Sequence, residues 1–151
     1  MHLHRAMDGA LEYSADGRPV ILLAEDEPVV RNFVQMALAY AGYHVLAACD
    51  GAEALALSRS FQGAIDLVLS DVKMPNVAGP QLAQTIMNER PGIRVLLMTG
   101  KSSGEIPEML RPELLRKPFL PKQLFEKIER ALASAPARPP EPPSGTGLPT
   151  Q

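Results

Sequence analysis

Short apolar runs alternate with segments of helical spacing between residues 19 and 135 of the chain. Continuous apolar runs are typical of strands buried on both faces of a sheet, and they predict parallel strands rather than exposed hairpins. The pattern predicts five strands, over Val20–Ala24, Tyr43–Ala48, Asp66–Ser70, Arg94–Met98 and Glu113–Arg116.

The segments between these strands predict helices. The first helix begins at Pro28, which is suited to a first helical turn, and it ends before Gly42. Its apolar residues keep helical spacing at Val29, Phe33, Ala37 and Tyr40. Two further helices cover Ala52–Phe61 and Pro80–Glu89. The last helix has a core stripe made of Leu120, Leu124, Ile128 and Ala131.

Strands that alternate with helices predict right-handed crossovers and therefore an α/β fold with a doubly wound parallel sheet. In such sheets, sites form at the carboxyl ends of the strands. The residues that directly follow each strand are therefore the candidates for chemistry.

Composition narrows the class of protein. Of the 151 residues, 15 are Lys or Arg and 17 are Asp or Glu, a balance that argues against coating nucleic acid or an anionic membrane. No apolar run approaches the ~18 residues of a spanning helix. The start of the chain lacks a secretory signal, and the single cysteine, Cys49, cannot form an internal disulfide. We expect a cytoplasmic domain over 19–135, a flexible leader over 1–18 and a disordered proline-rich tail over 136–151.

The predicted strand ends carry polar side chains in register. Glu25 and Asp26 follow the first strand, Asp71 the third, Thr99 the fourth and Lys117 the fifth. Carboxylates packed together destabilise a fold unless a cation joins them, and oxygen ligands suit Mg²⁺. A metal, a lysine and a hydroxyl around one carboxylate describe a site for phosphoryl transfer, with the carboxylate as nucleophile.

These residues belong to an ordered set of motifs. The set comprises Glu25-Asp26, Asp71 with Met74-Pro75 and Gly79, Thr99-Gly100, and Lys117-Pro118-Phe119. It resembles the receiver domain of bacterial two-component response regulators, over about residues 19–135. The resemblance implies a flavodoxin-like sheet with strand order 2-1-3-4-5.

The resemblance also implies a role for each acidic residue. Asp71 matches the aspartate that becomes an aspartyl phosphate. Glu25 and Asp26 match the acidic pair that holds Mg²⁺ together with Asp71. The backbone carbonyl of Lys73 matches the main-chain ligand of that ion.

The remaining motifs match groups that respond to the phosphoryl group. Thr99 matches the hydroxyl residue that turns towards it, and Lys117 matches the lysine that pairs with it. The peptide bond between Lys117 and Pro118 is expected to be cis, with Phe119 buried beneath it.

Two features depart from the family pattern. Leu114 stands where the family commonly has the aromatic ring that moves with the threonine, so we expect leucine to act in this switch. Thr99 and Lys117 are only 18 residues apart, so the fourth helix of the family is expected to be short, distorted or missing. Both changes fall on the usual dimer face of receivers, so we expect recognition at the altered face or near the first helix.

Lys73 and Lys101 follow Asp71 and Thr99 by two residues. They are candidates for tuning the lifetime of the phosphoryl group by controlling the access of water. Two ordinary solvated lysines are the other interpretation.

The sequence therefore predicts a phosphorelay signalling domain rather than a conventional enzyme. A sensor histidine kinase or a histidine phosphotransfer protein would supply the phosphoryl group, and the output would be a contact with another protein, with no direct nucleic acid or membrane partner. Only about 16 residues follow the last helix, so we expect a stand-alone regulator or the receiver of a hybrid kinase. The alternative is a degenerate receiver that binds proteins without phosphorylation.

Overall fold

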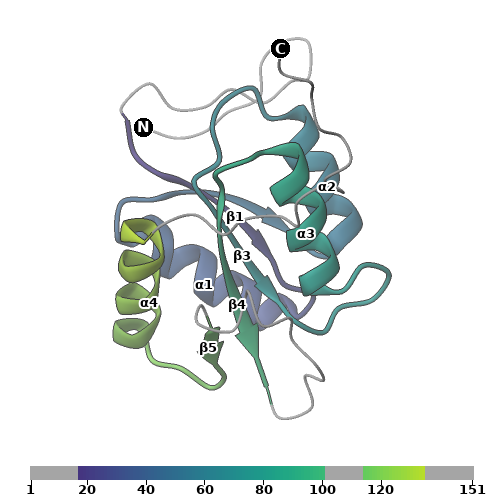
Figure 1. Cartoon of the computed structure of the whole chain (residues 1–151). Coiled ribbons are helices and arrows are strands. Elements are labelled where there is room, and N and C mark those ends of the chain that lie inside the picture. The colour runs from purple at the N-terminus through teal and green to yellow at the C-terminus, as the bar shows by residue number, and fades with distance from the viewer. Residues whose placement is uncertain (1–16, 101–113, 135–151) are drawn as a thin grey trace, which may run out of the picture.

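The computed structural model of the chain describes residues 17–100 and 114–134. These residues form one sheet of five parallel strands in the order β2-β1-β3-β4-β5, with helices on both faces (Figure 1). The strands are β1 (Val20–Ala24), β2 (His44–Ala48), β3 (Leu67–Asp71), β4 (Arg94–Thr99) and β5 (Leu114–Arg116). The helices are α1 (Pro28–Tyr40), α2 (Gly51–Ser60), α3 (Gly79–Glu89) and α4 (Pro121–Ala133).

This architecture confirms the predicted doubly wound parallel sheet and its strand order. The predicted strands, and the second and third predicted helices, end within one residue of the observed elements wherever the chain is described. The expected short fourth helix and proline-rich tail lie outside the described residues, as does the expected leader except for Gly17 and Arg18.

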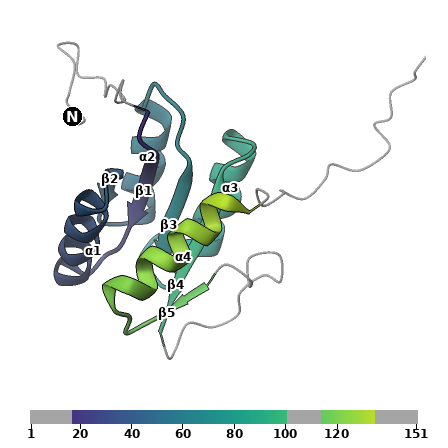
Figure 2. The same ribbon diagram turned by 90° about the vertical axis from the view of Figure 1, so that its left-hand side faces the viewer.

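β1 lies inside the sheet and feeds a core on each face. Val20, Leu22 and Ala24 pack into the core beneath α2 and α3, whereas Ile21 and Leu23 pack into the core beneath α1 and α4. Figure 2, turned by 90°, shows α1 and α4 on the side of the sheet that faces the viewer. Because every residue of β1 is buried, its sequence is a continuous apolar run rather than an alternating one.

The structure shows which residues of α1 form its core face, a point that helical spacing alone left open. Val34 and Leu38 are the buried residues of this helix. Three of the residues that predicted the helix are on its outer side: Val29 is 80% exposed, Phe33 42% and Tyr40 91%. α1 therefore carries a second apolar stripe, which the described part of the chain leaves largely exposed.

The core stripe of the last helix also needs one correction. Leu124, Ile128 and Ala131 are buried as predicted, but Leu120 is 67% exposed. Leu120 is the residue that precedes the first turn of α4, and its backbone N–H donates to the side chain of Gln123. None of the described helices combines the length and the apolar character needed to cross a bilayer.

On the other face of the sheet, Arg90 joins α3 to the end of α2. Its guanidinium donates to the hydroxyl of Ser58 at 3.0 Å and to the backbone carbonyls of Ser58 at 2.7 Å, Phe61 at 3.0 Å and Gly63 at 2.8 Å. The last carbonyls of a helix have no partner within the helix. Arg90 thus satisfies groups at the carboxyl end of α2 from the carboxyl end of its neighbour.

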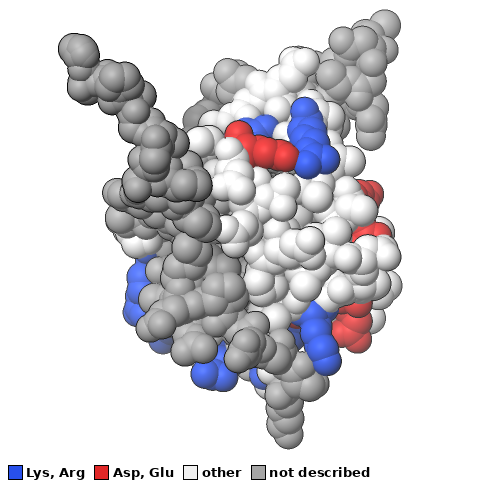
Figure 3. All heavy atoms as spheres, turned by 45° about the vertical axis from the view of Figure 1, so that its right-hand side comes forward, with Lys and Arg blue, Asp and Glu red and all other residues white. Residues whose placement is uncertain are grey.

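A second contact joins the same two helices at the surface. Arg59 of α2 forms an ion pair with Glu89 of α3 at 2.7 Å. The face of the molecule shown in Figure 3 carries few charged side chains over its centre. Exposed ion pairs of this kind contribute little, because water screens them.

We expect Arg90→Ala to lower the free energy of unfolding by about 2 kcal/mol, because half-buried carbonyls lose a charged donor. Urea unfolding followed by circular dichroism measures this change. Arg59→Ala is the matched control, since it removes an exposed guanidinium from the same pair of helices and should change little. Equal losses in the two variants would contradict this account.

Candidate functional site

The ends of four strands bring the predicted residues to one edge of the sheet. β1 and β3 pair with Ala24 opposite Ser70, so Glu25 and Asp71 follow at the same level. β4 and β5 pair with Thr99 opposite Arg116, and the backbone N–H of Lys117 donates to the carbonyl of Thr99 at 2.8 Å. Parallel pairing alone therefore places the acidic residues and the lysine at a common edge.

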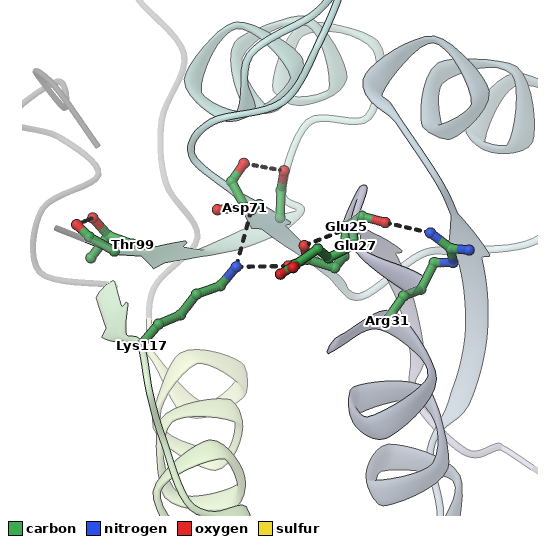
Figure 4. Close-up of polar contacts among 8 residues, drawn as sticks. Glu25, Glu27, Arg31, Asp71, Thr99 and Lys117 are labelled. Carbon is green, nitrogen blue, oxygen red and sulfur yellow. Dashed lines mark hydrogen bonds and ion pairs between the residues drawn. The ribbon is translucent and has the colours of Figure 1, made fainter. Parts of the chain in front are cut away.

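Lys117 bridges two carboxylates at this edge (Figure 4). Its Nζ lies 3.0 Å from Oε1 of Glu25 and 3.1 Å from Oδ2 of Asp71. Glu25 is fully buried, and Asp71 is only 8% exposed. A charge removed from water is costly unless it is paired, so the ammonium group makes both carboxylates tolerable in the fold.

Burial and ion pairing have opposite effects on the pKa values of Glu25 and Lys117. Burial raises the pKa of Glu25, the hydrogen bond from Lys117 works against this rise, and the charge of Asp71 adds to it. For Lys117, burial works to lower the pKa, but the bonds to Glu25 and Asp71 prevail and raise it. The ammonium group of Lys117 is therefore stabilised in its charged form, whereas the bond from Lys117 does not fully offset the burial of the Glu25 carboxylate.

A third carboxylate completes the cluster. Oxygens of Glu25, Asp26 and Asp71 all lie within 4.8 Å of one another. Lys117 offsets one of the three formal charges, and the remainder matches a divalent cation. The donors are all oxygen, and Asp26 is exposed to solvent, so the residues fit Mg²⁺, which keeps several waters when bound.

Two further residues fix Glu25, and sequence reasoning did not find them. The backbone N–H of Glu27 donates to Oε2 of Glu25 at 3.1 Å, and Nη1 of Arg31 donates to the carbonyl of Glu25 at 2.9 Å. Arg31 lies in the first turns of α1 and reaches back to the strand end (Figure 4). Helical spacing gives no sign of such a contact, because the bond runs to the backbone.

Thr99 is buried at the end of β4, and its hydroxyl lies 3.3 Å from the carbonyl of Gly100. Figure 4 shows this hydroxyl pointing away from Asp71. Leu114 is half-buried in the first position of β5 and packs against the core beneath α2 and α3. Lys73 is exposed, and Lys101 lies outside the described residues.

The segment after β5 contains the cis peptide bond between Lys117 and Pro118. Phe119 is half-buried rather than buried, which corrects the expectation from the resemblance. Its ring lies against Phe33 of α1, with the ring centroids 6.4 Å apart. Phe119 packs against Phe33, which is itself 42% exposed at the surface of α1, and this contact leaves part of the Phe119 ring in solvent.

A groove of about 550 Å³ opens between α1 and this loop, next to the carboxylate cluster. Its lining is mainly apolar and comprises Val29, Val30, Phe33, Gly100, Lys117, Pro118 and Phe119. The apolar stripe of α1 therefore runs up to the edge that holds Lys117.

Comparison with known proteins defines the class. The sequence model of the response regulator receiver domain matches residues 21–129. The chain is 34% identical over 119 residues to the response regulator receiver protein CpdR of Brucella abortus, which covers 76% of this chain and 98% of CpdR. It is 40% identical over 92 residues to the probable transcriptional regulatory protein TcrX of Mycobacterium tuberculosis, which covers 60% of this chain and 38% of TcrX. Sensor kinase CckA of Brucella abortus is 34% identical over 120 residues, 77% of this chain and 13% of that kinase.

Solved structures agree with the sequence matches. The receiver domain of the hybrid histidine kinase CckA superimposes with a TM-score of 0.64 at 34% identity, covering 75% of this chain and 98% of that domain. A CheY-like receiver domain protein from Methanospirillum hungatei gives a TM-score of 0.68 at 28% identity, covering 77% of this chain and 94% of that protein. The chain belongs to the response regulator receiver domain family of two-component systems.

We expect Lys117→Met to destabilise the metal-free protein by roughly 2 kcal/mol, because two carboxylates lose their common partner. Glu25→Gln in the same background should recover part of this loss, since it removes one of the repelling charges. Urea unfolding in the presence of a chelator measures both values. A double variant as unstable as Lys117→Met would contradict the assigned balance of charges.

Proposed function

We propose that this receiver domain accepts a phosphoryl group on Asp71, in a Mg²⁺-dependent reaction with a phosphorylated histidine of a sensor kinase or of a histidine phosphotransfer protein. The observation that carries the proposal is the ammonium group of Lys117, 3.1 Å from the Asp71 carboxylate inside a cluster of three acidic residues. An anion that approaches Asp71 would meet a cation already in position.

The metal would be held by Asp26, Asp71 and the backbone carbonyl of Lys73, with Glu25 acting mostly through water. Bound there, Mg²⁺ supplies positive charge to the oxygens of the transferring group. Family membership and the closeness of the three carboxylates support this assignment.

In the transfer step, a carboxylate oxygen of Asp71 attacks phosphorus while the bond from phosphorus to the donor nitrogen breaks. The electron pair of that bond stays on the imidazole, which then takes up a proton. Hydrolysis restores the carboxylate of Asp71, since water attacks phosphorus, the bond from phosphorus to the Asp71 oxygen breaks, and inorganic phosphate and a proton are released. Lys73 and Lys101 are candidates for controlling that water.

The new oxygens would change the surroundings of Asp71. A phosphoryl group adds about -1.5 to -2 charge and needs donors, which Lys117 and Thr99 can supply. Thr99 and Leu114 lie on neighbouring strands near the site, so an inward turn of the hydroxyl would let Leu114 repack. The signal would be a shift of population between two packings of the same fold.

We further propose that the exposed apolar stripe of α1 meets the phosphodonor. The stripe comprises Val29, Phe33, Met36 and Tyr40, and Met36 is 71% exposed. It adjoins the groove beside Lys117, so a partner seated on it could present a phosphohistidine to Asp71. Large exposed apolar patches commonly mark protein interfaces.

Incubation with acetyl phosphate and Mg²⁺ should add one phosphoryl group to the intact mass of the protein. Asp71→Asn and removal of Mg²⁺ with a chelator should each abolish the adduct, because the first lacks the nucleophile and the second lacks the neutralising charge. If small donors, phosphorylated kinases and beryllofluoride all fail, the chain is a phosphorylation-independent binding module instead.

Met36→Ala should slow phosphotransfer from a panel of phosphorylated sensor kinases about tenfold if Met36 anchors the contact, since the few residues that anchor an interface each cost more than about 1 kcal/mol when truncated. Transfer from acetyl phosphate should not change, because a small donor does not touch the stripe. Gln35→Ala, next to Met36 in sequence but turned to another side of α1, is the matched control. Equal slowing with both kinds of donor would place the defect in the site rather than in docking.

A further inference from the structure

The loop between β3 and α3 contains a strained turn. Asn76 has a φ of 70°, and the backbone N–H of Val77 donates to the carbonyl of Pro75 at 2.8 Å. A bond between residues two apart around a left-handed central residue is a γ-turn of the rare, strained kind. Such a conformation persists only when its surroundings hold it.

One end of this loop is held by the phosphoacceptor strand itself. Val72 donates its N–H to the carbonyl of Met98 at 2.9 Å, and Gly79 donates to the carbonyl of Val72 at 2.9 Å. A Cβ on Gly79 would overlap the carbonyl oxygen of Asp71, so only glycine fits there. These contacts fix where the loop leaves β3 and where it enters α3, but they do not touch the turn at Asn76.

The turn is held by α2. A Cβ placed on Gly51 would lie 2.5 Å from Cβ of Val77 and 2.7 Å from its carbonyl oxygen. Val77 is therefore seated directly on the bare backbone of Gly51, and it also packs against the core beneath α2 and α3. We call this contact the Gly51–Val77 seat.

The seat is built on a rigid part of α2. Asp50 precedes the helix, and its side chain accepts from the N–H of Glu53 at 2.8 Å. Glu53 in turn accepts from the N–H of Cys49 at 2.7 Å. Reciprocal bonds of this kind fix the entry of the chain into a helix. The backbone of Gly51 is therefore held in a fixed position, and Val77 of the loop packs directly against it.

We infer that Gly51 is a positioning residue for the phosphoacceptor site, acting through Val77 on the loop that carries Lys73. The inference rests on the proposed function for its consequence. The carbonyl of Lys73 lies between the strand end and the strained turn, so its direction depends on both anchors. Mg²⁺ demands near-ideal octahedral geometry, so a small shift of one ligand weakens binding.

A double-mutant cycle tests the seat. Gly51→Ala pushes the loop outward, and Val77→Gly releases it, so each should raise the Kd for Mg²⁺ about tenfold. The double variant adds a methyl group at residue 51 and removes the isopropyl group of residue 77 that it would strike, so it should bind Mg²⁺ more tightly than the two losses combined would allow. Calorimetric titration with Mg²⁺ measures all four proteins. Additive losses would overturn the inference.

Ala52→Gly is the matched control, because it makes the reverse change on the exposed side of the same helical turn. It should leave the Kd for Mg²⁺ unchanged while lowering thermal stability. If Ala52→Gly weakens Mg²⁺ binding as much as Gly51→Ala does, the effect is one of general stability and the seat plays no special part.

A measurement on metal-free protein distinguishes failure of the proposed function from failure of the Gly51–Val77 seat. If the natural chain neither binds Mg²⁺ nor takes a phosphoryl group, the proposed function is wrong, and amide exchange followed by NMR then decides the seat. Gly51→Ala should remove the protection of the Val77 amide, whose bond to the carbonyl of Pro75 closes the turn at Asn76. Unchanged protection would overturn the seat itself.

Discussion

The ammonium group of Lys117 makes it possible for this fold to keep several carboxylates close together, because it pairs with both Glu25 and Asp71. A doubly wound parallel sheet gathers the ends of its strands at one edge, and here those ends bear carboxylates that repel one another. Glu25 has no exposed surface, so water cannot moderate that repulsion. Lys117 does so from β5, across two strands, and it remains partly exposed with 22% of its side chain accessible. Lys117 thus lets the protein fold without a metal ion, but three carboxylates and one ammonium group still leave an excess of negative charge. That excess would favour the binding of a cation, which in turn would favour the approach of an anion.

The part of the fold that could be predicted is the part governed by burial in regular elements. β1 and β3 are fully buried, so their residues form apolar runs that end where the polar site begins. For α1 the same logic identified the helix but not the side that packs on the sheet, since Val29, Phe33 and Tyr40 have helical spacing and are nevertheless exposed. A helix with apolar residues on two sides gives periodicity without saying which side meets the sheet. Only the packing of Val34 and Leu38 resolves this.

The candidate site could be anticipated as a set of residues but not as a set of contacts. Strand ends and motif spacing brought Glu25, Asp71 and Lys117 together, yet nothing in the sequence indicated that one Nζ would contact both carboxylates. The supports of the site were missed for a shared reason. Arg31 donates to a backbone carbonyl, and Gly51 acts by lacking a side chain, so neither contact depends on a recognisable pairing of residue types.

The outer stripe of α1 has a consequence for the behaviour of the protein in solution. Apolar side chains that project into water are attracted to any other apolar surface, not to one partner alone. Val29, Met36 and Tyr40 each leave most of their surface exposed, and they lie on a chain whose formal net charge is only -2. Weak net charge gives little repulsion between copies. The colloidal stability of the purified domain should therefore fall as its concentration rises, and any partner that covers that helix would restore it.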